Sequence, residues 1–324
     1  MYIVTGGAGF IGSAMVWRMN QAGISNILVV DNLASSEKWR NLVNLRYVDY
    51  MQRDEFRRLF REKSGELKSA KCVIHMGACS STTERDADFL MDNNFHYTRE
   101  LCEAALAAGC RFIYASSAAT YGSAASGFDD ADSHTVTLKP LNLYGYSKQL
   151  FDLWALRAGV LNTIAGLKFF NVYGPNEYHK GDMRSVVCKA FYQALETGEI
   201  RLFASDRSEY PDGGQMRDFI HVKDCADVIF WLMEHRKVNG LFNLGTGSAR
   251  TWNDLTHAVF KAMDLPTAIR YVEMPEALRG KYQYFTKAPM RKLADTGCPL
   301  NFRALEQGVE DYVRNYLGTD DPYL

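Results

Sequence analysis

The sequence lacks the features that mark membrane-spanning and nucleic-acid-binding proteins. Its apolar runs stay short of the ~20 residues needed to cross a bilayer, and the opening stretch 1–6 is typical of a first strand rather than a secretory signal. Lys and Arg number 37 against 38 Asp and Glu, so the formal net charge is only -1. A chain without a strong overall field has no general attraction for nucleic acid or anionic lipid. We therefore predict a cytoplasmic protein with no nucleic-acid and no membrane partner.

Features typical of metal and disulfide chemistry are also missing. The seven cysteines include no Cys-x-x-Cys pair and are odd in number, and the histidines show no His-x-x-x-His spacing. These patterns favour reduced thiols in a cytosolic protein over a disulfide framework. No metal site is predicted.

Short apolar runs alternate with longer segments of helical spacing in the first half of the chain. Such alternation predicts right-handed crossovers and a doubly wound parallel sheet of the α/β (Rossmann) class, covered by helices on both faces. The expected strands are Tyr2–Thr5, Ile27–Val30, Cys72–His75, Phe112–Ala115 and Ile164–Phe169. The expected helices lie at about 11–22, 53–62, 86–108 and 146–159.

The pattern changes after about residue 170, where proline and glycine interrupt the chain and long loops carry many Arg and Lys residues. This change predicts a smaller substrate-binding domain beyond the ends of the strands. Leu241–Gly245 again resembles a strand and is expected to return to the main sheet. The predicted division is an interleaved one. It gives a cofactor-binding Rossmann domain at 1–170, with a return near 218–247, and a substrate-binding domain at 171–324, mainly 171–217 and 248–324.

A glycine-rich loop follows the first expected strand and opens the first helix. It has the pattern Gly-x-Gly-x-x-Gly at positions 7, 9 and 12, where a tight turn, close approach of a pyrophosphate and helix–strand contact each favour glycine. Asp31 ends the second strand, at about the spacing of a carboxylate that binds the ribose. A purely structural glycine turn is the alternative, but the strand, helix and acid together favour a dinucleotide site.

The residues alone do not decide between NAD and NADP. Asp31 would accept hydrogen bonds from ribose hydroxyls and would repel a 2′-phosphate. Lys38, Arg40 and Arg53 follow it in the next loop and helix, where they could bind that phosphate or simply face solvent. Both cofactors therefore remain open at this point.

Tyr144 and Lys148 form a Tyr-x-x-x-Lys pattern near the start of an expected helix, which places both side chains on one face. A phenol with an ordinary pKa near 10 is a poor base at neutral pH, and a nearby ammonium and a positive nicotinamide ring would favour the phenolate. Ser116 and Ser117 lie at the end of the strand that begins near Phe112, and either hydroxyl could assist the reacting alcohol. This combination predicts an alcohol-oxidising site.

These residues resemble those of the extended short-chain dehydrogenases over nearly the whole chain. The resemblance rests on the glycine loop and on Asp31-Asn32, Gly77-Ala78-Cys79-Ser80, Asn93, Ser117, Tyr144 with Lys148, and the stretch 170–175. Four sharper stretches, at 78–84, 91–94, 179–181 and 280–283, are similar to the ADP-L-glycero-D-manno-heptose 6-epimerases. That likeness implies a tightly held NADP, with NAD as the alternative, and a homo-oligomer. It also implies interconversion of ADP-D-glycero-D-manno-heptose and ADP-L-glycero-D-manno-heptose through a 6″-ketone, a step in making the heptose precursor of the lipopolysaccharide core.

The resemblance also implies a set of site residues. The catalytic set consists of Tyr144, Lys180, Ser117 and Lys148. The cofactor-binding set consists of Gly6, Gly9, Phe10, Ile11, Gly12, Asp31, Asn32, Lys38, Arg53, Met76, Gly77, Ala78, Cys79, Ser80, Asn93, Lys148, Val172 and Lys180. The substrate-binding set consists of Asn171, Asp182, Lys189, Phe203, Ala204, Ser205, Asp206, Arg217 and Tyr282. The sequence departs from the family pattern in a longer 205–215 loop, and in Arg53 and Met76 where a Lys and a Glu occur.

The sequence also bears on three alternative functions. A 4,6-dehydratase of this group is expected to carry an Asp-Glu pair at the position of Ala118-Ala119, so the sequence argues against it. A UDP-hexose 4-epimerase typically uses the tyrosine as its one base, so the match at 179–181 favours the heptose enzyme. A cofactor-sensing protein without catalysis usually loses the tyrosine or the lysine, and Tyr144 and Lys148 are both present.

Overall fold

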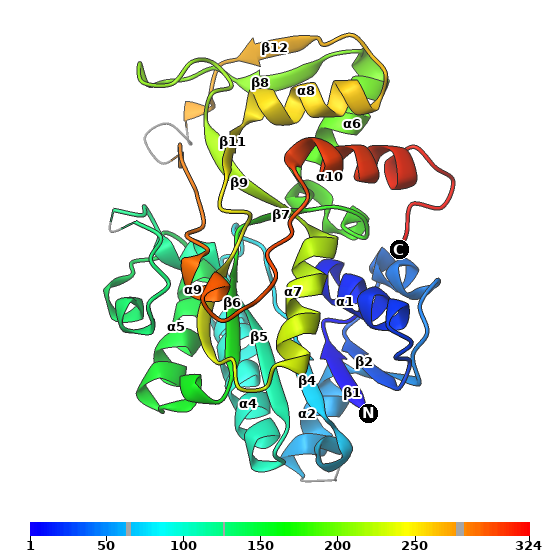
Figure 1. The fold of residues 1–324 in the computed structure, drawn as a ribbon, viewed down its shortest axis with the longest axis vertical. Helices are drawn as coiled ribbons and strands as arrows, with labels where there is room; N and C mark the ends of the chain where they lie inside the picture. Colours follow the sequence, from blue (N-terminus) through cyan, green and yellow to red (C-terminus); the bar gives the residue numbers. More distant parts are fainter. Residues whose placement is uncertain (63–65, 126, 277–281) are drawn as a thin grey trace.

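The computed structural model describes residues 1–62, 66–125, 127–276 and 282–324. Its main feature is a seven-stranded sheet, in the lower half of Figure 1, in which all neighbouring strands are parallel. The order across the sheet is β10-β6-β5-β4-β1-β2-β3. The strands are β1 (Tyr2–Thr5), β2 (Ile27–Asp31), β3 (Asp49–Gln52), β4 (Cys72–His75), β5 (Arg111–Ser117), β6 (Ala165–Phe169) and β10 (Gly240–Leu244).

The five expected strands of the first half of the chain and the returning strand are all present, so the predicted α/β class is confirmed. Their apolar, often β-branched residues are buried because helices cover both faces of a parallel sheet. The strand β3 was not expected from the sequence. Its residues Asp49–Gln52 are polar or half-exposed and form the edge of the sheet, where an apolar run is not required.

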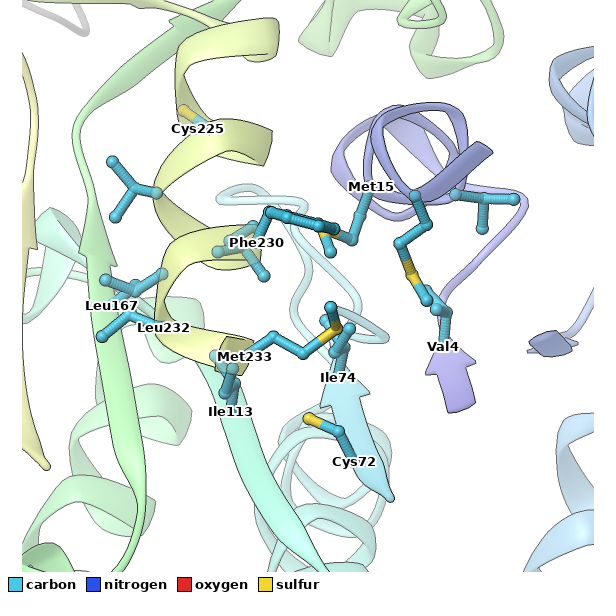
Figure 2. Packing of buried hydrophobic residues seen from close by; sticks show 14 of the residues in the cluster. Val4, Met15, Cys72, Ile74, Ile113, Leu167, Cys225, Phe230, Leu232 and Met233 are labelled. Atoms are coloured by element: carbon cyan, nitrogen blue, oxygen red, sulfur yellow. The ribbon is translucent and has the colours of Figure 1, made fainter. Parts of the chain in front are cut away.

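Helices on the two faces of the sheet enclose two separate hydrophobic clusters. On one face, α1 (Phe10–Gln21) and α7 (Val222–Glu234) lie against the sheet, and Figure 2 shows Met15, Phe230 and Met233 meeting Ile74 and Ile113 there. On the other face the cover consists of α2 (Arg53–Arg61), α4 (Tyr97–Ala107) and α5 (Leu143–Arg157). Full burial of one such side chain stabilises the fold by ~1.5–3 kcal/mol, so the sheet is a rigid base for the site.

The expected helix at 86–108 is one helical segment with an irregular centre. It consists of α3 (Ala87–Leu90), a π-helical turn at Met91–His96, and α4. Such turns are often found at functional sites because they change which side chains face inward. Here Asn93 and Asn94 are both buried although they are adjacent in sequence.

The expected helix at 146–159 begins earlier in the structure than in the prediction. It is α5, and the side chain of Asn142 caps its start by accepting the N–H of Gly145 at 2.8 Å. Tyr144 therefore lies in the first helical turn and Lys148 in the second.

The chain after residue 170, apart from α7, β10 and α9, forms a smaller region in the upper half of Figure 1. A three-stranded sheet has the order β11-β9-β7, and β8 pairs in parallel with β12. The strands are β7 (Asn171–Tyr173), β8 (Ile200–Phe203), β9 (Met216–His221), β11 (Ala249–Thr251) and β12 (Ile269–Val272). The helices of this region are α6 (Val186–Thr197), α8 (Trp252–Ala262) and α10 (Leu305–Tyr312). The short helix α9 (Arg291–Ala294) instead packs against β10 of the main sheet. Among the described residues, no helix has the length and apolar character required to span a bilayer.

Candidate functional site

A cavity of about 640 Å³ lies beyond the carboxyl ends of β1, β4, β5 and β6 and extends toward β7 and α8. A second cavity of about 170 Å³ adjoins it, and the two share lining residues that include Gly6 and Asp31. The strand order reverses between β1 and β4. In open α/β sheets this switch point is where ligands bind.

The glycine loop brings the backbone close to the cavity. Gly6 adopts a φ of 65°, and a Cβ atom there would lie 2.5 Å from the backbone nitrogen of Gly77 in the neighbouring loop. A Cβ atom on Gly12 would overlap the carbonyl oxygen of Gly6. Gly9 precedes α1 without a side-chain cap, so the free N–H groups of the first helical turn are available to a ligand. This cradle fits a dinucleotide pyrophosphate at a helix N-terminus.

Asp31 is held in place at the end of β2 by three donors. Its carboxylate accepts the N–H of Ala8 at 2.9 Å and that of Asn32 at 2.7 Å, and Lys38 lies 2.5 Å from it. The residue is buried and lines both cavities. Lys38 therefore offsets the negative charge at the position where an adenosine ribose is expected.

Arg53 and Asn93 meet in the smaller cavity. The guanidinium of Arg53 donates to the side-chain oxygen of Asn93 and pairs with Asp54 at 2.7 Å. Asn94, which follows Asn93, accepts the N–H of Cys79 and donates to its carbonyl oxygen, both at 2.9 Å. The π-helical turn thus fixes the loop after β4. The sequence analysis did not select Asn94, although the stretch that contains it was recognised.

The structure separates the two serines at the end of β5. Ser116 donates to the buried carboxylate of Asp152 at 2.7 Å. Ser117 lines the large cavity with Tyr144, and the two side chains share a hydrogen bond. Burial raises the pKa of the Tyr144 phenol, and the hydrogen bond with Ser117 opposes this rise. Ser117 is therefore the serine placed to assist Tyr144.

Lys148 lies one turn beyond Tyr144 on α5 and also lines the cavity. Its ammonium donates to the carbonyl oxygen of Ala115 at 2.9 Å. Burial lowers the pKa of Lys148 to about 8, while Asp152 and Cys79 oppose the change. The ammonium of Lys148 can therefore lose its proton near neutral pH after a modest change in its surroundings.

Lys180 reaches the same cavity from the loop after β7, where its ammonium lies 5.1 Å from the centre of the Phe10 ring. Burial lowers the pKa of Lys180, Glu177 opposes the change, and the cationic Lys189 adds to it. Glu177 is fully buried and accepts both the backbone N–H and the hydroxyl of Ser185, which closes the loop around Lys180. Both causes that could depress this pKa, burial and a neighbouring cation, are therefore present.

One link between the Lys180 loop and the glycine loop was missed from the sequence. The amide nitrogen of Asn41 donates to the carbonyl oxygens of Ala8 at 2.9 Å and Asn176 at 3.0 Å, and lies 3.2 Å from His179. His179 lines the cavity, and burial lowers its pKa to about 4, with Lys38 and Lys180 adding to the effect. No local motif marks Asn41, because its partners are distant in sequence.

The structure brings every residue of the predicted cofactor set to one of the two cavities. Four of them line the smaller cavity alone, and the others line the larger one. The four are Asn32, Arg53, Cys79 and Asn93. Arg40, which the sequence left open, instead pairs with Glu37 at the surface.

Only part of the predicted substrate-binding set lies at the large cavity. Asn171 lines the large cavity, whereas the exposed Asp182 and Lys189 do not. Arg217 forms a separate group with aromatic rings, since its guanidinium lies 5.2 Å from the ring of Tyr282 and 5.7 Å from that of Trp252. Trp252, which donates to the hydroxyl of Tyr282 at 3.0 Å and lines the cavity, was not predicted.

Phe203 joins this group through an edge contact with Tyr282, at 6.2 Å between ring centres. The 205–215 loop is attached nearby, because Asp206 accepts the hydroxyl of Tyr284 and Ser205 donates to the carbonyl of Arg207 at 2.8 Å. Ala204 follows the strand β8 and is half-buried. Gly280 and Lys281, part of one recognised stretch, lie outside the described residues.

Comparisons with known proteins agree with this geometry. Residues 2–245 match the model of the NAD dependent epimerase/dehydratase family. ADP-L-glycero-D-manno-heptose-6-epimerase of Nitratidesulfovibrio vulgaris is 64% identical over 325 residues, covering 100% of both chains. The protein of the same name from Fusobacterium nucleatum is 45% identical over 335 residues, again with 100% of both covered. The crystal structure of Helicobacter pylori ADP-L-glycero-D-manno-heptose-6-epimerase has a TM-score of 0.79 at 25% identity, covering 97% of this chain and 95% of that one.

Proposed function

The chain belongs to the NAD dependent epimerase/dehydratase family, and we propose that it is an ADP-glycero-manno-heptose 6-epimerase. The reaction interconverts ADP-D-glycero-D-manno-heptose and ADP-L-glycero-D-manno-heptose by inverting C6″. Its role is to supply the heptose precursor of the lipopolysaccharide core. Relatives that share 64% and 45% of their residues with this chain over their full length carry that name.

One observation carries the proposal most directly: Tyr144 and Lys180 line the same cavity from different elements. Tyr144 comes from α5, and Lys180 comes from the loop after β7. An epimerase of this kind must move a proton at the same oxygen on two faces of the sugar carbon. Two separate acid/base groups suit that task, because each can serve the sugar oxygen in one of its two orientations.

We assign the proton transfers to Tyr144 and Lys180, with Ser117 holding the reacting oxygen through its hydroxyl. A catalytic pKa works best near the operating pH. Burial already lowers the pKa of Lys180. For Tyr144 the Ser117 hydrogen bond works in the required direction against burial. Lys148 binds the nicotinamide ribose and adds positive charge near the phenol.

The nicotinamide cofactor, when bound, supplies the acceptance and return of a hydride, so that the alcohol passes through a 6″-ketone within one turnover. We propose NADP as that cofactor. Lys38 pairs with Asp31 at 2.5 Å, and Arg53 lines the adjoining cavity. Asp31 alone would repel a 2′-phosphate, and these two cations offset its charge and offer partners to the phosphate.

The ADP end of the substrate is assigned to the group around Arg217. Arg217 is 8% exposed, and its guanidinium donates to the carbonyl oxygen of Met216 at 2.8 Å, which leaves further N–H groups for a diphosphate. Phe203 and Tyr282 supply ring faces beside it. Lys189, Asp182, Asn171 and the residues at 204–206 complete the proposed substrate set.

Three further assignments belong to the same proposal. The substrate domain comprises mainly 171–217 and 248–324, and the cofactor domain comprises 1–170 with a return near 218–247. The enzyme acts in the cytoplasm, which its seven unpaired cysteine thiols suit. It works as a homo-oligomer.

The first experiment is to incubate the purified protein with ADP-D-glycero-D-manno-heptose, without added cofactor, and to follow C6″ by NMR. The nicotinamide released on denaturation is identified in parallel. Conversion to the L-glycero form with recovered NADP supports the proposed substrate, reaction and cofactor together. Bound nicotinamide without conversion would retain the hydride-transfer site but move the substrate to a UDP- or dTDP-hexose. Neither conversion nor nicotinamide, even after soaking with NADP, would contradict the proposal.

A further inference from the structure

A buried ion pair lies directly behind the proposed catalytic residues and has no part in the reaction described above. Tyr144, Lys148 and Asp152 follow one another at four-residue spacing on α5, so they share one face of that helix. Asp152 is 0% exposed, and its carboxylate lies 2.8 Å from the ammonium of Lys168 on β6, which is 1% exposed. Figure 1 shows α5 beside β6 and β5.

The carboxylate of Asp152 ties α5 to two strands. It accepts the hydroxyl of Tyr114 at 2.8 Å and that of Ser116 at 2.7 Å, in addition to the ammonium of Lys168. Tyr114 and Ser116 belong to β5, and Lys168 belongs to β6. The helix that carries Tyr144 and Lys148 is therefore held in register with the strand end that carries Ser117.

Lys168 extends the same network to Ser117 itself. Its ammonium also donates to the hydroxyl oxygen of Thr120 at 2.8 Å, and the Thr120 hydroxyl donates to the carbonyl oxygen of Ser117 at 2.8 Å. The Ser117 side chain then accepts the N–H of Ala119 at 3.1 Å. The backbone of Ser117 is thus linked to the ion pair through Thr120, and its hydroxyl is held locally by Ala119.

Stability alone gives a weak reason for two buried charges at this place. Taking both ions out of water costs several kcal/mol each, and apolar residues of similar volume often stabilise a fold as well or better. A fully hydrogen-bonded pair does, however, specify one arrangement of its neighbours. Here the bonded neighbours are Tyr114, Ser116 and Thr120. Thr120 leads on to Ser117, and Asp152 lies one helical turn beyond Lys148.

We propose that Asp152 and Lys168 are positioning residues, whose ion pair holds Lys148 charged and Ser117 aligned for proton transfer by Tyr144. This inference rests on the proposed function, since it takes Tyr144 as an acid/base group. Neither residue of the pair lines the cavity. Both act through other residues and touch neither cofactor nor substrate.

Among the groups that face Lys148, Asp152 is the one whose charge supports the ammonium. On β4, burial lowers the pKa of His75 to about 3, so this side chain stays neutral. In the next loop, burial raises the pKa of the Cys79 thiol, which therefore also stays neutral. Tyr144 lies on the same helix, and burial raises the pKa of its phenol. Removing the carboxylate of Asp152 should therefore lower the pKa of Lys148, and the ammonium should be lost at a lower pH.

The test compares Asp152→Asn with the parent protein over a range of pH. We expect kcat for ADP-heptose epimerisation to fall at least ~10-fold at neutral pH, because misplaced reacting groups cost rate, with KM unchanged. The alkaline limb of kcat should move to lower pH by about one unit. The alkaline limb of NADPH binding, followed by fluorescence, should move in the same direction, and this readout does not depend on turnover.

Asp224→Asn is the matched control. Asp224 is also a buried carboxylate with an arginine partner, Arg303, but it lies on α7 away from the cavity. It should lower thermal stability and leave both pH profiles in place. Equal pH profiles for Asp152→Asn and the parent, or an equal shift in the control, would overturn the proposal.

Thr120→Val keeps the test decisive if Asp152→Asn fails to fold. It removes one hydroxyl between Lys168 and Ser117 and keeps the side-chain volume, and it should lower kcat several-fold without a change in KM. An unchanged kcat would contradict the proposal. If the parent protein does not epimerise ADP-heptose, the proposed function has failed. The NADPH-binding profile of Asp152→Asn then still decides whether the pair controls Lys148.

Discussion

The proposed cofactor side and the proposed substrate side of the site are built in different ways. The cofactor side is formed by backbone at the ends of parallel strands, where Gly6 lies close to both Gly12 and Gly77. The substrate side is formed by large side chains, Arg217 and Tyr282 among them, from segments far apart in the sequence. The conformation of a backbone cradle can be predicted from local sequence. The arrangement of a group of side chains from distant segments depends on the tertiary contacts between those segments.

The two sides also treat charge differently. On the cofactor side, the cations near the ribose position are already paired, Lys38 with Asp31 and Arg53 with Asp54. On the substrate side, Arg217 forms no ion pair with any residue in the described part of the chain. Burial lowers the pKa of its guanidinium, with Tyr282 opposing the change. A buried cation flanked by rings, such as Arg217, is suited to bind an anionic group of a ligand. A cation that is already paired with a carboxylate, such as Lys38, instead changes which ligand the site prefers.

The largest expected effect on activity comes from removing the two proposed acid/base groups, Tyr144 and Lys180, which lie between the cofactor side and the substrate side. Tyr144→Phe combined with Lys180→Met should lower the rate of epimerisation by at least ~10⁴-fold, since each acid/base group contributes 10²–10⁴-fold. The nicotinamide should remain bound, because the glycine loop and Asp31 are untouched. Turnover by NMR and cofactor content after denaturation check this. Appreciable activity in the double variant would remove the proposed mechanism.

The next effect tests the backbone cradle alone. In Gly12→Ala the added Cβ atom would overlap the carbonyl oxygen of Gly6. Such overpacking costs ~1–3 kcal/mol, and the displaced loop should hold NADP at least ~10-fold less tightly. Ultrafiltration of the purified variant measures the retained cofactor. The control is Gly159→Ala, where no atom lies within 4 Å of the added Cβ; its positive φ makes some loss of stability expected, but cofactor retention should match the parent.

Much of the cofactor side was predictable from sequence, because it is built from backbone segments that each carry a local sequence pattern. The strand β1, the glycine loop, Asp31 and the Tyr144–Lys148 pattern each lie within a short window, and the parallel sheet brings such windows to one edge. All the cofactor residues inferred from the family resemblance line the two cavities. The choice of Ser117 over Ser116 came from the family resemblance and not from spacing, because it depends on Asp152, 36 residues away from Ser116.

The substrate side was predicted from resemblance, and only in part. Trp252 lies at the start of α8 and reaches Tyr282 and Arg217 only through tertiary contacts, so no spacing marks it. The edge strand β3 was missed because it is polar. The π-helical turn at Met91–His96 was missed because its residues have ordinary helical propensity.

Arg217→Ala should weaken binding of the substrate without weakening binding of the cofactor. Loss of charged hydrogen bonds to a diphosphate costs ~1.5–3 kcal/mol, which corresponds to a KM for ADP-heptose about 10- to 100-fold higher. Cofactor content should match the parent, because Arg217 lies outside both cavities. Steady-state kinetics and released nicotinamide check this prediction. Arg201→Ala, at a half-exposed position on β8, is the control, and a loss of cofactor in Arg217→Ala would contradict the division into two sides.

The smallest expected effect concerns the paired cation on the cofactor side. In Lys38→Ala the carboxylate of Asp31 loses its partner at 2.5 Å and should repel a 2′-phosphate while still accepting ribose hydroxyls. Lys38 is partly exposed, so solvent and salt weaken the effect, and we expect the ratio of NADP to NAD affinity to fall only ~10-fold. Fluorescence titration with NADPH and NADH measures the ratio, and raising the salt concentration should shrink the difference. Arg40 lies on the same short 3₁₀-helix, Glu37–Leu42, and pairs with Glu37, so Arg40→Ala should leave the ratio unchanged. An equal loss of affinity for both cofactors in Lys38→Ala would show that the cation only supports the loop, and the proposed preference for NADP would then rest on Arg53 alone.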